Sequence, residues 1–153
     1  MAQKQISLTG SDTLTIFNRN ITSFATGDYF TFNFDQELFK VDLGKGGNAV
    51  YAFNSPGQVA KGILKVLRGS IDDIYLNSLL AAAIANPSEF VLGNCIAVKR
   101  IGNGNGTIRN DVYIFGGGIF TKFPMVKGNQ QGDPEQAIVS YEITFTAITR
   151  AVQ

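Results

Sequence analysis

The sequence predicts a mainly β fold of the α+β class, a sandwich or barrel-like sheet with one helix packed on it and one long protruding hairpin. Three observations lead to this fold class: a strand with strict two-residue alternation, two hairpins with glycine-rich tips, and one helical segment. The chain has 153 residues, enough for one domain with its own core. No linker, repeat or low-complexity tract divides it, so we expect residues 1–153 to form a single domain.

The alternating strand is Ser140–Arg150. A period of two is typical of a strand with one buried face and one wet face. The buried face is expected to carry Tyr141, Ile143, Phe145 and Ala147, and the wet face Ser140, Glu142, Thr144 and Thr146. The strand Asp28–Asp35 repeats the pattern, with Thr31 and Asn33 between inward-pointing phenylalanines. Such a bland polar face indicates a wall or a scaffold rather than a reaction site.

Six more strands complete the predicted β structure. Short strands are expected at Thr13–Phe17 and Ile63–Arg68. Glycine-rich tips, which permit positive φ, predict two hairpins, one joining Leu38–Leu43 to Ala49–Phe53 and one joining Val91–Ile101 to Thr107–Phe123. The triplet Gly116-Gly117-Gly118 is expected to form a bulge or bend in the last of these strands.

The helix is expected at Ile71–Ala85. Ser70 can cap its start, and Asp72 and Asp73 suit the positive end of its dipole. The pair Asn86-Pro87 ends it. Its core-facing residues are expected to be Ile71, Ile74, Tyr75, Leu79 and Leu80.

Composition argues against an enzyme. Histidine, the commonest general acid–base, is absent. The single cysteine, Cys95, excludes an internal disulfide and a CxxC metal site, and is expected to be a small buried apolar residue. Asp72 and Asp73 are adjacent on a helix and point about 100° apart, so they do not converge on a substrate. We therefore predict no catalytic residues, no cofactor and no metal.

Two other motifs give no function. Residues 44–49 fit the G-x-G-x-x-A form of a dinucleotide fingerprint, but β-favouring residues follow where a helix is required. Residues 102–106 lack the Lys-Ser/Thr of a phosphate loop. The formal net charge is +1 and only 16% of residues are charged, so no strong field favours nucleic acid or membrane.

The first hairpin has an apolar face without an evident partner. Its members are Phe39, Val41 and Leu43 on one strand, with Tyr51 and Phe53 on the other. Because a two-stranded ribbon is only marginally stable alone, the hairpin either folds back on its own core or is covered by another subunit.

The stretch Gly62–Ser70, running into Ile71–Leu80, resembles a region of the tail tube proteins of contractile-tailed bacteriophages and related contractile injection systems. The shared pattern is a hydrophobic strand, a short serine-containing break, and a helix with Asn and Leu near Asn77-Ser78-Leu79. The hairpin Leu38–Phe53 and the closing strand Ser140–Ala147 lie in matching order, so the resemblance spans most of the chain.

The resemblance implies a structural virion protein whose homohexameric rings stack into an inner tail tube for genome delivery. The hairpin would join subunits, a sheath would surround the tube, and tape measure and baseplate hub proteins would be further partners. The lumen would be lined by Thr31, Asn33, Glu142, Thr144 and Thr146, and its short Thr, Ser and Asn side chains would offer no cationic anchor for the phosphates of passing DNA. The expected location is the virion tail, assembled in the host cytoplasm, without membrane insertion.

Two rival functions remain at the sequence level. A monomeric ligand-binding β-sandwich of the carbohydrate-module type needs exposed aromatic rings; tryptophan is absent, but five tyrosines leave room for it. An enzyme lacks a recognisable pairing of nucleophile and base. Rings or tubes in electron micrographs would favour the tube protein, whereas a monodisperse monomer would favour the sandwich.

Overall fold

The computed structural model describes residues 6–8, 10, 12–25, 27, 29–126, 128 and 130–153, apart from the Ser7 side chain. The helical elements are α1 (Ile71–Ala85) and two 3-10 turns, η1 (Ser55–Gln58) and η2 (Pro134–Ala137). The strands are β1 (Ser7–Leu8), β2 (Thr13–Ile16), β3 (Arg19–Asn20), β4 (Phe30–Phe34), β5 (Phe39–Leu43), β6 (Ala49–Phe53), β7 (Ala60–Leu67), β8 (Gly93–Gly102), β9 (Ile108–Lys122), β10 (Ile138–Phe145) and β11 (Ala147–Val152).

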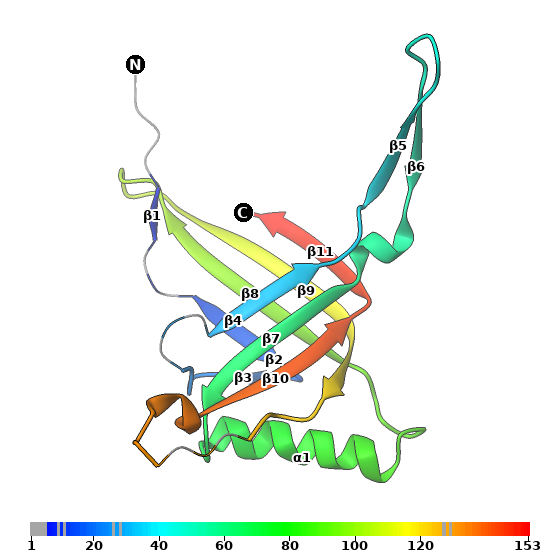
Figure 1. The fold of residues 1–153 in the computed structure, drawn as a ribbon. Coiled ribbons are helices and arrows are strands. Elements are labelled where there is room, and N and C mark those ends of the chain that lie inside the picture. Colours follow the sequence, from blue (N-terminus) through cyan, green and yellow to red (C-terminus); the bar gives the residue numbers. More distant parts are fainter. Residues whose placement is uncertain are drawn as a thin grey trace.

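Nine strands form one antiparallel sheet that curls over itself, as Figure 1 shows. Their order is β3-β2-β8-β9-β10-β7-β4, with β1 beside β8 and β11 beside β9. The long strand β9 links the two layers, because its first part pairs with β8 and β11 and its end pairs with β10. This arrangement confirms the mainly β fold, and α1 lies across one end of it.

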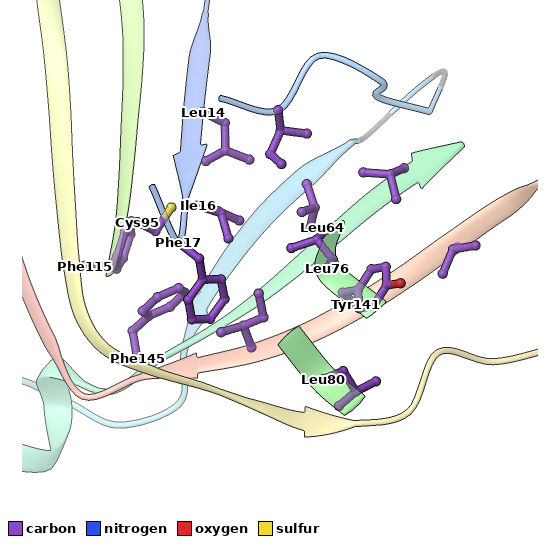
Figure 2. Packing of buried hydrophobic residues seen from close by; sticks show 14 of the residues in the cluster. Leu14, Ile16, Phe17, Leu64, Leu76, Leu80, Cys95, Phe115, Tyr141 and Phe145 are labelled. Carbon is purple, nitrogen blue, oxygen red and sulfur yellow. The ribbon is translucent and has the colours of Figure 1, made fainter. Parts of the chain in front are cut away.

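The core fills the space between the layers (Figure 2). Its fully buried members come from both layers and from α1, among them Ile16, Leu64, Leu76, Cys95, Phe115, Tyr141 and Phe145. Phe32 of β4 stacks on Phe115 of β9 with ring centroids 3.7 Å apart, so aromatic contacts join the layers directly. Cys95 is buried, as predicted, and burial raises the pKa of its thiol to about 12.

The helix begins and ends where the sequence predicts, but only part of its predicted apolar face is buried: Leu80 is in the core, and Tyr75 and Leu79 pack against it. Ser70 Oγ accepts a hydrogen bond from Asp73 N, and Asp73 Oδ2 accepts one from Gly69 N. The side chains turned into the protein are Asp72, Leu76 and Leu80, one helical turn apart. Ile71 and Ile74, expected in the core, are 70% and 64% exposed. The difference arises because Asp72 is itself anchored inside the protein and so fixes the rotation of the helix.

The closing strand is also not continuous. Tyr141, Ile143 and Phe145 are buried as expected, but the chain bends at Thr146 and continues as β11. After the bend Ala147 is exposed, while Ile148 packs against the core. The prediction that Ala147 faces the core is therefore wrong, because one extra residue at a bend exchanges the two faces of a strand.

Both glycine-tipped hairpins are confirmed, with β5 paired to β6 and β8 paired to β9. The strand predicted at Asp28–Asp35 appears as β4, and Asp28 lies outside the described residues. Phe30 and Phe32 are partly buried, but Phe34, expected to point inward, is 45% exposed at the end of that strand. The glycine triplet lies within β9, where a side chain at Gly118 would meet the Phe145 ring. Gly118 therefore allows a close approach between β9 and β10.

Candidate functional site

The first candidate surface is the hairpin of β5 and β6, called the arm here, which stands away from the body of the protein (Figure 1). Among the described strands these two pair only with each other. Antiparallel register places Phe39 opposite Phe53, Val41 opposite Tyr51, and Leu43 opposite Ala49. Residues directly opposite each other share a face of a sheet. We call this set of six residues the arm face.

All ten residues of the two arm strands are exposed. On the arm face, the exposed fraction of the predicted residues runs from 55% at Val41 to 73% at Leu43. The Phe39 and Phe53 rings contact each other, with centroids 5.5 Å apart, but this contact leaves both more than half exposed. Of the two alternatives left by the sequence, the structure therefore contradicts the one in which the arm folds back on its own core.

The base of the arm is closed by hydrogen bonds. Asn54 N donates to Leu38 O at 2.8 Å, and Asn54 Nδ2 donates to Glu37 O at 2.8 Å. Gly57 lies against the segment that leads into β5, since a Cβ there would be 2.5 Å from Glu37 O. The arm thus leaves the body through a short, tightly packed junction, which fixes its starting direction.

The second candidate surface is the outer face of the sheet formed by β4, β7 and β10. Register aligns Thr31, Ile63 and Glu142 in one row, and Asn33, Lys61 and Thr144 in the next. The structure therefore brings together four of the five residues predicted to line a lumen. Thr146 lies apart from them, at the bend after β10. We call the two aligned rows, with Lys122 beside Glu142, the sheet face.

The sheet face carries positive charges that the sequence analysis did not place there. Lys61 lies opposite both Asn33 and Thr144, and Lys122 lies opposite Glu142. Two ion pairs partly balance them, Lys122 Nζ–Glu142 Oε2 at 3.5 Å and Lys61 Nζ–Asp35 Oδ2 at 3.4 Å. The expectation of a face without cations is therefore wrong. Lys61 and Lys122 belong to β7 and β9, and only the register of these strands against β10 places them on this face.

Thr144 also differs from its prediction in how far it is exposed to solvent. It was expected to be wet, but the residue is only partly exposed, and its Oγ1 has no accessible surface and no hydrogen-bond partner among the described residues. The cause is its position between β7 and β9, where Lys61 and Ile119 flank it in register. Thr31 and Asn33, on the edge strand β4, are exposed as predicted.

The perturbed ionisable groups of the described residues support the fold rather than a reaction. Burial acts to raise the pKa of Asp72, but hydrogen bonds from Ser23 N, the Arg19 side chain and Thr22 N outweigh it and hold that pKa below its ordinary value. Burial also raises the pKa of Tyr141, whose hydroxyl donates to Asp73 at the start of α1. Asp72 was expected only to complement the helix dipole, and its role as a buried anchor for residues 19–23 was missed.

Within the described residues there is no group of three or more His, Cys, Asp or Glu placed to hold a metal ion. The same part of the chain has no helix long and apolar enough to cross a membrane.

Comparison with known proteins identifies the fold. The sequence matches no protein-family model, and no curated protein sequence matches it. Among solved structures, the anti-feeding prophage cap, a tube-terminating cap, aligns with a TM-score of 0.65 and 12% identity over 100% of this chain and 95% of that chain. A chain of the PVC sheath–tube complex of an extracellular contractile injection system aligns with a TM-score of 0.52 and 10% identity over 93% of this chain and 87% of that chain.

A chain of the PVC sheath/tube terminator aligns with a TM-score of 0.52 and 14% identity, over 93% of this chain and 92% of that chain. The three similarities extend over nearly the whole of each chain. They confirm the tail-tube-like fold that the sequence predicts.

Proposed function

We propose that this protein is a structural subunit of the tube in a contractile tail or injection machine, and that it is not an enzyme. The arm face is the observation that carries the proposal. It holds six apolar residues on a ribbon that the described part of the chain leaves exposed. A monomer gains nothing from exposing such a surface, whereas a permanently assembled subunit covers it. The solved structures that share this fold are parts of sheath–tube complexes and of tube ends, and such assemblies support the proposal that a neighbouring subunit covers the arm face.

In the proposed assembly, six copies form a ring and rings stack into a tube. The arm binds a neighbouring copy, and the sheet face, with Thr31, Asn33, Glu142 and Thr144, lines the channel. Thr146 lies at the rim of that face rather than within it. A sheath, tape measure and baseplate hub proteins are the proposed partners, and the site of action is a tail or injection particle assembled in the host cytoplasm.

The proposed cargo is DNA that passes through the lumen without specific binding. The ion pairs of the sheet face are consistent with this, because Glu142 pairs with Lys122 and Asp35 pairs with Lys61. Each pair engages a lysine that would otherwise be free to contact phosphate. A face of balanced charge holds a polyanion weakly and releases it as it moves.

A second candidate function is the terminator of such a tube. Two of the three structural comparisons are with terminator proteins, and the one with the TM-score of 0.65 is a tube-terminating cap. A terminator would form one ring that binds the end of a tube, whereas a tube subunit would stack on itself.

Electron microscopy and sedimentation of the purified chain test these proposals. Tubes at high protein concentration would support the tube subunit, and single rings at every concentration would support the terminator. A monomer over the whole concentration range would contradict both and favour the monomeric ligand-binding sandwich.

A variant pair then tests the arm itself. Phe39→Ala, Val41→Ala and Leu43→Ala together remove one strand of the arm face and should leave a folded, poorly assembling chain. The control changes Lys40 and Asp42 to alanine on the opposite face of the same strand, which should leave assembly intact. Unchanged assembly of the triple variant would show that the arm face is not an interface.

A further inference from the structure

The outer surface of α1 is unusual for a helix that faces solvent. Its only charged residues are Asp72, which is buried, and Asp73, which caps the helix start and accepts the Tyr141 hydroxyl. No charged residue follows up to Ala85, while Ile71 and Ile74 are exposed. A helix that is apolar nearly all round is normally covered on every side.

A second segment joins this helix surface. After β9 the chain runs past α1 (Figure 1), with Phe123 73% exposed and Val126 83% exposed. Phe123, Val126 and Ile74 line one groove of about 490 Å³, which Asn77 and Ser78 also line. We call these five residues the helix groove. Arg68 and Asp73 also line it, and Asp73 is already engaged by the helix cap.

We infer that the helix groove receives the arm face of a second copy of this chain. The inference rests on the proposed function, and it names the surface to which the arm binds. The arm and α1 lie at opposite ends of the molecule (Figure 1), so a chain does not cover its own groove with its own arm. Each copy therefore gives its arm to one neighbour and receives the arm of another.

The two surfaces match in chemistry and length. The arm face presents aliphatic and aromatic side chains, and Ile74, Phe123 and Val126 present the same kind on the groove, beside the small polar side chains of Asn77 and Ser78. A five-residue strand is about 17 Å long, and a helix of 15 residues is about 22 Å long, so the ribbon fits along the helix.

The area is also sufficient for a stable contact. A buried Phe or Tyr covers about 150–250 Å². Phe39, Tyr51 and Phe53 are 56%, 71% and 58% exposed, so together they offer roughly 300–400 Å². With the aliphatic side chains and a similar area on the groove, the total approaches the ~1,000 Å² of a specific interface.

A second copy explains these surfaces better than a different protein. Interfaces that open and close in use are more polar, and permanent ones resemble a protein core cut in half. A sheath that moves over a tube needs the first kind, whereas the apolar side chains of Ile74, Phe123 and Val126 in the helix groove favour the second kind. A contact between two different patches of one chain is heterologous, and it closes into a ring or continues as a filament.

The test uses two blocked variants. Val41→Glu puts a charge on the arm face, and Ile74→Glu puts one in the helix groove. Matched controls make the same changes at Val50, on the opposite face of the arm, and at Ile84, which is 53% exposed on α1 but outside the groove. All four positions are exposed, so the folded monomer should tolerate each change, which circular dichroism checks.

Sedimentation should show that each blocked variant alone needs about tenfold or more higher concentration to assemble than the unmodified chain, while the controls behave normally. Mixed together, the blocked variants should associate, because one retains an intact arm and the other an intact groove. The contact should be confirmed by a disulfide between Leu43→Cys on the Ile74→Glu copy and Phe123→Cys on the Val41→Glu copy. Buried Cys95 does not compete.

The outcomes separate this inference from the proposed function. If the unmodified chain assembles and Ile74→Glu assembles equally well, the arm does not bind the helix groove and the inference is overturned. The same holds if both blocked variants fail alone and their mixture neither associates nor cross-links. If the unmodified chain stays a monomer at every concentration, it is the proposed function that fails, and the inference falls with it.

Discussion

Truncating one aromatic ring of the arm should weaken assembly by a predictable amount. Phe53 is 58% exposed in the monomer, and the Phe39 ring covers part of the rest. Full burial of a phenylalanine stabilises by about 1.5–3 kcal/mol, so covering the exposed half contributes about 1–2 kcal/mol. Phe53→Ala should therefore weaken each arm contact by about 5–30-fold in its association constant.

The measurement is sedimentation velocity over a concentration series, with the midpoint of assembly compared between Phe53→Ala and the unmodified chain. Ala52→Ser, on the opposite face of the same strand, is the matched control and should leave the midpoint unchanged. The thermal unfolding midpoint of the monomer should be nearly the same in all three chains, because the ring is not part of the core.

Two results would refute this reasoning. If Phe53→Ala lowers the stability of the monomer by as much as it weakens assembly, the ring supports the subunit itself rather than a contact between subunits. If the midpoint of assembly does not move, the arm face stays exposed after assembly, and the burial assumed in the calculation does not occur.

Three further predictions concern the body of the protein. Asp72→Asn should lower the free energy of unfolding by about 1–3 kcal/mol and flatten its acid dependence. The pKa of Asp72 is held below its ordinary value of 3.8 in the folded chain, so its stabilisation is present above that pH and is lost as the pH falls through the folded pKa. Urea titrations at several pH values give the free energy of unfolding as a function of pH, and the same dependence on pH in both chains would contradict the prediction. Gly118→Ala should destabilise by about 1–3 kcal/mol, because the new Cβ would lie 2.3 Å from the Phe145 ring, whereas Gly116→Ala meets its nearest atom at 3.9 Å and should cost little; equal unfolding midpoints would contradict this. Glu142→Gln should increase the binding of duplex DNA to assembled protein and steepen the slope of log K against log salt by up to about 0.9 per new phosphate contact, measured by fluorescence anisotropy; an unchanged slope would show that the sheet face does not meet DNA.

Local sequence patterns predicted the elements well because they depend on neighbours along the chain. Alternation in Ile138–Phe145 follows from the two faces of a strand, and Ser70 with Asp73 marks the start of α1 through hydrogen bonds within one turn. The tips of both hairpins follow from glycine's access to positive φ, seen at Gly46 and Gly104. None of these inferences requires knowledge of what lies across the sheet.

The errors arise where a distant contact decides the outcome. The rotation of α1 is set by Asp72, whose partners lie about fifty residues earlier in the chain, and helical periodicity alone could not choose between Leu76 and Ile74 for the core. The lysines of the sheet face were visible in the sequence, but their place beside Thr144 depends on the register of β7 against β10. The chain bends at Thr146, which ends the alternation of buried and exposed residues in β10, and no glycine or proline at that position indicates the bend in the sequence.

The misassigned isoleucines also carry the clearest functional signal in the chain. Apolar residues with helical spacing were assigned to the core because a core is the usual place to bury them. The structure leaves Ile71 and Ile74 in solvent, on a helix with no charged residue beyond its first turn. Single exposed apolar residues are common, but an apolar surface built from several neighbouring residues is not, and the arm presents such a surface at the other end of the molecule. In the proposed assembly, these two exposed apolar surfaces, on α1 and on the arm, are the parts that pack between copies.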